Sequence, residues 1–106
     1  MRQAQVFYKN EKAGLLIQKD DGSFTFHYHD NWFKDSSKSG ISLTLPKSKQ
    51  EYNSETLFSF FYNMLPEGSN KHTVCKLNRI DTDDYFGLLI TVATNDNIGA
   101  VTVMKI

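Results

Sequence analysis

The segment LFSFFYNMLPEG, Leu57 to Gly68, is the densest apolar stretch of this chain and decides its fold. Polar residues recur every four positions at Glu55, Ser59 and Asn63, a spacing that places them along one edge of a helix. The rest of that helix is apolar, so it needs cover on more than one side. We therefore expect a central helix with a sheet on one side and further helices on the other.

Both ends of this helix carry boundary signals. Ser54 is the expected N-cap, and Glu55 adds negative charge to the first turn, where the helix dipole favours it. Pro66 lacks a backbone donor and biases Leu65 away from helical angles, so we expect the helix to end there. Gly68 then allows the chain to turn.

The first half of the chain alternates apolar and polar residues, which is the pattern of half-buried strands. We expect four strands, at Gln3–Tyr8, Gly14–Lys19, Ser23–His29 and Ile41–Leu45. Asp20-Asp21-Gly22 predicts a hairpin, and Lys9–Ala13 a turn. Asp30 or Asn31 would cap a single helical turn, and Lys47–Asn53 reads as a polar connection into the central helix.

Two further helices and a strand are expected after Gly68. Ser69 or Asn70 would cap a helix that runs to about Arg79, with a narrow apolar stripe of Val74, Leu77 and Ile80. Asp81 or Thr82 would cap a helix from Asp83 to about Thr94, ended by Asn95–Asn97, and Gly99–Ile106 reads as a closing strand. The expected fold is therefore α+β, a small curved antiparallel β-sheet or barrel of about five strands with about three helices.

Length and composition set further limits on the protein. The 106 residues fit one domain, residues 1–106, and 40% hydrophobic residues argue against disorder. Twelve basic and twelve acidic residues cancel, so DNA contact is expected only indirectly, through a partner. The single cysteine, the lack of a signal-peptide core and the lack of a long apolar run predict a cytoplasmic protein without a membrane contact.

No set of residues predicts catalysis, a cofactor or a metal site, so we expect a non-enzyme. His27 and His29 lie two apart on one strand face, but only Asp30 could join them, and two exposed histidines are the simpler interpretation. Helix capping explains the acidic group at residues 81–84. A small buried filler is the expected role of Cys75.

Three features are candidates for contact with a partner. The first is the connection between two helices, with Pro66, Glu67, Gly68, Ser69 and Asn70. The second is a basic helical edge formed by His72, Lys76 and Arg79, for which a solvated face is the alternative. The third is Trp32, either an exposed anchor or, as we expect with its neighbour Phe33, a plug at one end of the sheet.

Three segments in this order resemble the N-terminal subdomain of HipA-type serine/threonine kinases. They are ISLTLP at Ile41–Pro46, FFYNMLPEG at Phe60–Gly68 and DDYFGLLITVATNDNIGAVTV at Asp83–Val103. That family shows a strand ending in S-L-P, a helix reading F-F-x-x-L-L-P, then D-x-F-x-L-L and a G-A-V strand. The opening hairpin, with G-x-L at Gly14–Leu16, fits as well.

The resemblance implies a function that the residues alone do not. In HipA-type toxins this subdomain continues into a kinase core, whereas this sequence ends at Ile106. It is therefore similar to the HipS-like antitoxin of three-part HipBST systems. That resemblance implies binding and inhibition of a HipT-like kinase, beside a HipB-like helix-turn-helix repressor. The alternatives are a non-inhibitory subunit that bridges kinase and repressor, and an N-terminal fragment of an intact HipA kinase.

Overall fold

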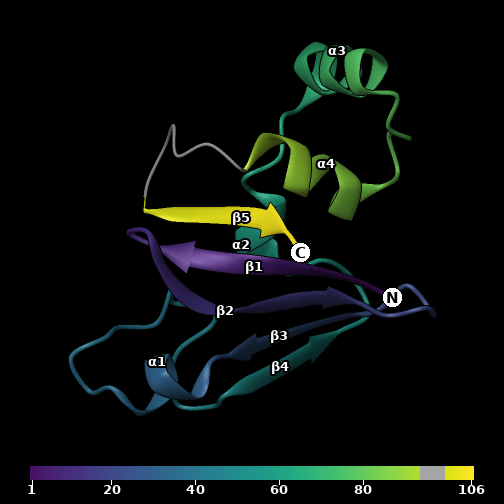
Figure 1. Cartoon of the computed structure of the whole chain (residues 1–106). Coiled ribbons are helices and arrows are strands. Elements are labelled where there is room, and N and C mark those ends of the chain that lie inside the picture. Colours follow the sequence, from purple (N-terminus) through teal and green to yellow (C-terminus); the bar gives the residue numbers. More distant parts are fainter. Residues whose placement is uncertain (94–99) are drawn as a thin grey trace.

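A computed structural model describes residues 1–93 and 100–106 of the chain and shows an α+β fold, as predicted. In the described part, five strands form one antiparallel sheet in the order β4-β3-β2-β1-β5 (Figure 1). The strands are β1 (Arg2–Tyr8), β2 (Glu11–Gln18), β3 (Phe24–Tyr28), β4 (Glu51–Ser54) and β5 (Val101–Lys105). The sheet is open and not a closed barrel, because β4 and β5 form its two edges.

Two tight turns set the register of the first three strands. Lys9 and Asn10 have φ of 50° and 68°, as in the two-residue turns that match the twist of a hairpin. The predicted turn at Lys9–Ala13 is therefore too long, since β2 already begins at Glu11. The second hairpin turns at Gly22, with φ of 90°, as the Asp-Asp-Gly sequence predicts.

The core lies between one face of the sheet and the helical layer. Alternate strand residues, including Val6, Leu16 and Phe26, are fully buried on this face. Helices α2 (Ser59–Tyr62) and α4 (Tyr85–Val92) pack over it, and the Phe61 ring lies 5.8 Å from that of Phe26. Figure 1 shows α3 (Gly68–Asn78) beyond α4, away from the sheet.

The predicted fourth strand at Ile41–Leu45 is wrong. These residues form a tight turn, in which the Leu45 N–H donates to the Ser42 carbonyl at 3.1 Å and Leu43 is fully exposed. The alternation of apolar and polar residues does not indicate a strand here, because Ile41 and Leu45 are buried at the two ends of a turn. The fourth strand is Glu51–Ser54, which was predicted as a polar connection.

The predicted central helix is correct in position and wrong in length. Phe61 is fully buried at the centre of the core, but α2 spans only Ser59–Tyr62. Phe58 before it is extended, with φ of −56° and ψ of 139°. Ser54 is not the N-cap, because it ends β4 and its Oγ accepts from the Thr56 N–H at 3.3 Å.

The flanking helices also begin elsewhere than predicted. In α3 the cap position is Glu67, without a side-chain bond, and not Ser69 or Asn70. Helix α4 begins after Asp84, whose carboxylate accepts from the Gly87 N–H at 3.0 Å, so the predicted caps at Asp81 and Thr82 are wrong. The predicted helix end at Asn95–Asn97 lies outside the described residues, as do Thr94 and Gly99.

The remaining elements complete the comparison. The single turn after β3 is α1 (Asp30–Lys34), which follows His29 and has no side-chain cap bond. Leu77 does not belong to a buried stripe, because it is 78% exposed, whereas Cys75 is buried as predicted. Across the described residues, we find no helix with the length and apolar character that a membrane crossing requires.

Candidate partner-binding surface

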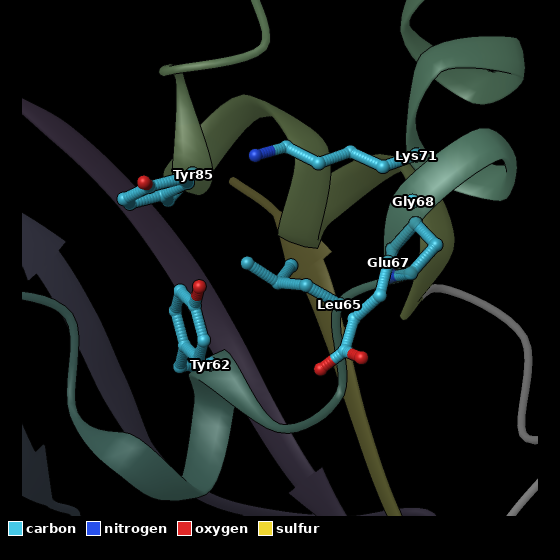
Figure 2. Close-up of a pocket in the computed structure, with 7 residues that line it drawn as sticks. Tyr62, Leu65, Glu67, Gly68, Lys71 and Tyr85 are labelled. Carbon is cyan, nitrogen blue, oxygen red and sulfur yellow. The ribbon is translucent and has the colours of Figure 1, made fainter.

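The connection from α2 to α3 forms one wall of a small surface pocket. Pro66 lies between α2, which ends at Tyr62, and α3, which begins at Gly68 with φ of 58°. The pocket measures about 160 Å³ and is drawn in Figure 2. Its lining residues are Tyr62, Leu65, Pro66, Glu67, Gly68, Lys71 and Tyr85.

Tyr62 of α2 and Tyr85 of α4 both line the pocket, and their rings contact each other. The rings of Tyr62 and Tyr85 meet edge to face, with centroids 5.6 Å apart and planes at 90°. The Lys71 ammonium lies 5.1 Å from the centroid of the Tyr85 ring, a cation–π distance. Figure 2 shows Leu65 between these side chains, so the pocket has an apolar floor, with the Lys71 ammonium and the Glu67 carboxylate among its lining groups.

The same tyrosines also line a second, larger groove, to which α2 contributes Ser59 and Tyr62. It measures about 480 Å³, and Leu57 and Phe58 add apolar surface to it. Tyr62 is 46% exposed at the junction between the pocket and the groove. Tyrosine gives a large contact area at low entropy cost and is enriched where proteins bind one another. The two hollows therefore form a continuous aromatic surface that a partner segment can cover.

Three of the predicted contact residues, Pro66, Glu67 and Gly68, line the pocket. Glu67, Gly68, Ser69 and Asn70 are exposed at the start of α3, and Pro66 is partly exposed in the pocket wall. His72 and Lys76 are exposed one turn apart on α3, and the C-cap residue Arg79 is exposed directly after the helix. Whether a partner contacts any of them stays a prediction.

Trp32 is the exception, because it is not an exposed anchor. It is only 5% exposed, and its Nε1–H donates to the Ser39 carbonyl at 3.0 Å. Its ring meets Tyr8 edge to face, with centroids 5.7 Å apart. Trp32 therefore closes one end of the core, which is the plug that the sequence favoured.

Sequence reasoning placed Lys71 beside the basic helical edge but missed Tyr62 and Tyr85 as members of the site. Tyr62 and Tyr85 were both assigned to apolar helix faces, since their spacing suits a core position. The available signal was their chemistry, because a tyrosine hydroxyl is most easily satisfied at the surface. Nothing in the sequence indicated that α2 and α4 would bring the two rings together.

The candidate metal residues have other neighbours. His27 Nδ1 lies 3.3 Å from Glu51 Oε1, and the His29 ring contacts the Gln5 amide. Burial, followed by the nearby His27, lowers the pKa of His29. In the ranges 1–93 and 100–106, no three side chains of His, Cys, Asp or Glu gather closely enough to hold a metal ion.

Comparison with known proteins identifies the fold and the family. The model of the HipA N-terminal domain family matches residues 4–104. The chain belongs to this family. This confirms the resemblance of the three sequence segments to the HipA N-terminal subdomain.

A solved structure of the N-terminal domain of HipA toxin is similar over the whole fold. The TM-score is 0.72 at 30% sequence identity, and the match covers 100% of this chain and 93% of that one. An uncharacterized protein of Haemophilus influenzae is 34% identical over 107 residues, which are 99% of this chain and 93% of the relative. The similarity to the Haemophilus relative therefore extends over almost the full length of both chains.

Proposed function

We propose that this protein is an antitoxin of the HipS type, which binds and inhibits a HipT-like serine/threonine kinase of the HipA family. The observation that carries the proposal is the match over 93% of the Haemophilus relative, because it indicates that this domain occurs as a separate protein. A domain that elsewhere belongs to a HipA toxin would keep a surface complementary to the kinase. As a separate chain, it would dock on the kinase in trans.

The aromatic surface around Tyr62 and Tyr85 supports this proposal. It combines apolar area with the exposed connection at Glu67 and Gly68, and partner contacts are commonly built in this way. An interface of ordinary size would bury about 1,200–2,000 Å² in total. That area would take in the pocket, the groove and part of α3. The protein itself would perform no catalysis, since occupying the kinase is sufficient.

The proposed assembly includes a HipB-like repressor and lies in the cytoplasm. DNA would contact this protein only through the repressor, because the chain has no net charge with which to attract phosphates. Two alternatives remain testable. The protein could bridge kinase and repressor without inhibition, or it could be the N-terminal part of an intact HipA kinase. A downstream reading frame continuous with Ile106 would establish the second alternative.

A phosphorylation assay tests inhibition. The kinase would be incubated with a protein substrate and increasing amounts of this protein, and phosphate transfer would be measured beside complex formation. We expect phosphate transfer to fall in step with complex formation. Full kinase activity in a saturated complex would reject inhibition and favour the bridging role. Absence of a complex would reject both.

Substitution of Tyr62 locates the interface. Tyr62→Ala removes the ring at the junction of pocket and groove, and we expect it to weaken the complex about tenfold, as for an interface anchor. Met104→Ala is the matched control, because Met104 is also 46% exposed but belongs to the edge strand β5. Equal affinities of the two variants would place the interface elsewhere.

A further inference from the structure

Helix α3 is poorly supported by the rest of the protein. Of its eleven residues, Gly68–Asn78, only Cys75 is buried, and its N-cap residue makes no side-chain bond. Isolated helices shorter than about 12–15 residues are marginal in water, and most helices are stabilised by packing an apolar face. Most of the surface of α3 has no such packing against the described residues, so a partner that covers it would complete the helix.

The charge of this segment differs from that of the rest of the chain. Residues 68–80 contain Lys71, Lys76 and Arg79 and no acidic residue, which leaves nine basic and twelve acidic residues elsewhere. Lys71 is turned toward the ring of Tyr85. Lys76 and Arg79 are exposed, and no ion pair involves them within the described ranges. A surface that complements α3 is therefore acidic.

An exposed leucine lies among these cations. Leu77 is 78% exposed, next to Lys76 and one helical turn after Thr73. Burial of a leucine side chain stabilises an association by roughly 1.5–3 kcal/mol, whereas phosphate groups give it no partner. An apolar side chain between cations therefore fits the surface of a protein better than it fits a nucleic acid.

The end of α3 supports the same interpretation. Arg79 adopts left-handed angles, with φ of 55° and ψ of 47°, at a position where glycine is most common. This conformation costs a residue with a side chain roughly 1–2 kcal/mol. It ends the helix, because the backbone N–H groups of Arg79 and Ile80 both donate to the Cys75 carbonyl. Here it places a permanent positive charge at the exposed C-terminus of the helix.

We propose that the outer face of α3 docks on an acidic surface of the kinase partner, with Leu77 in an apolar recess and cations around it. The face is formed by the exposed residues His72, Thr73, Lys76 and Leu77, with Arg79 at the C-cap. This inference rests on the proposed function and adds the chemistry of the surface that the partner presents. It predicts that α3 gains packing when the complex forms.

The test measures affinity for the purified kinase with single substitutions in the full chain. Leu77→Ala should weaken the complex about tenfold. It should keep the fold, since the side chain is mostly exposed and alanine favours a helix. Leu43→Ala is the matched control, because Leu43 is fully exposed on a turn that is distant in sequence from α3. This substitution should change the affinity less than twofold.

The charge contribution is measured at low and high salt. Lys76→Glu should weaken the complex about tenfold at low salt and reduce its salt dependence, because attraction between exposed charges is screened. Lys34→Glu makes the same charge change on α1 and should have little effect. Hydrogen exchange of the α3 amides should slow when the kinase is added.

The outcomes separate this inference from the proposed function. If the wild-type protein fails to bind the kinase, both are wrong. If it binds but the Leu77→Ala and Lys76→Glu variants bind equally well, only the inference on α3 is wrong. If Lys76→Glu abolishes binding of duplex DNA while Leu77→Ala leaves the kinase complex unchanged, α3 is a nucleic-acid contact and the proposal is overturned.

Discussion

At the scale of single residues, Asp84 connects the sheet to the helical layer. Its carboxylate caps α4 and accepts two bonds from the Arg2 guanidinium, at 2.6 and 3.0 Å. Arg2 also donates to Gln18 on β2, and its guanidinium lies 4.9 Å from the centroid of the Phe86 ring. A β-carbon on Gly87 would lie 2.3 Å from the Asp84 carboxylate, which explains the glycine in this helix.

Substitution of Asp84 should therefore destabilise the fold. We expect Asp84→Ala to lower the free energy of unfolding by about 1–2 kcal/mol at pH 7, mainly through the lost cap. The exposed neighbour Asp83 provides the control, and Asp83→Ala should change stability by less than about 0.5 kcal/mol. Urea denaturation measures both values, and equal effects of the two substitutions would contradict this role of Asp84.

The contribution of Asp84 should also depend on pH. The bond from Arg2 holds the pKa of Asp84 below its ordinary value of 3.8. The folded-state pKa is lower than the unfolded one, so the stabilisation is complete above about pH 4 and is lost as the pH falls through the folded-state pKa. Denaturation at pH 7 and at about pH 2 should show the wild type and Asp84→Ala converging in acid. A constant difference would contradict the linkage.

The Tyr28 hydroxyl fixes the turn at residues 41–45. It donates to the Leu45 carbonyl and accepts from the Ile41 N–H at 3.0 Å, and all three groups are buried. Burial also raises the pKa of Tyr28. Tyr28→Phe would leave two backbone groups unpaired, so we expect a loss of about 1–3 kcal/mol in unfolding free energy. Tyr62→Phe, at an exposed tyrosine, is the control, and a similar loss there would contradict the assignment.

At the scale of elements, the sequence predicts best where burial follows a regular period. Strands β1, β2 and β3 alternate because one face packs on the core, and their positions were predicted to within a few residues. The short edge strand β4 reads EYNS and offers only Tyr52 as an apolar residue. Its pairing with β3 depends on tertiary context, which local composition does not contain.

In the central apolar segment, burial does not follow a regular period, and the sequence predicts the helix boundaries poorly. Leu57, Phe58, Phe60 and Phe61 all pack in or against the core, although only part of the segment is helical. A segment surrounded by protein is apolar on every side, so periodicity cannot fix where its helix begins. The candidate site has the same limit, since its exposed connection was predictable from Pro66 and Gly68 but its tyrosine pair was not.

In the two hairpin turns, removing a glycine and introducing one should have opposite effects on stability. Gly22 has φ of 90° and no atom within 4 Å of a β-carbon built there, so Gly22→Ala tests conformation alone. We expect it to cost about 1 kcal/mol. Asn10 has φ of 68°, so Asn10→Gly should stabilise the protein by a few tenths of a kcal/mol. Thermal denaturation distinguishes the signs, and stabilisation by Gly22→Ala would contradict the turn geometry.

At the scale of the whole molecule, the helical side carries the features suited to binding. The aromatic pocket (Figure 2) and the second groove share Tyr62 and Tyr85, and α3, which carries the basic residues, follows directly after the pocket residues Glu67 and Gly68. Leu57 belongs to the hydrophobic core and Phe58, Leu65 and Tyr85 pack against it, whereas Tyr62 and the basic residues of α3 are exposed. The candidate surface therefore joins residues that stabilise the domain to exposed residues that are available to a partner.

A growth experiment tests inhibition of the kinase most directly. Cells would express a HipA-family kinase toxin with or without this protein, and growth would be recorded while complex formation is monitored by co-purification. Our account predicts that the wild-type protein restores growth and that Tyr62→Ala, at equal abundance, restores it less. Growth arrest that persists although the complex is recovered would contradict the account.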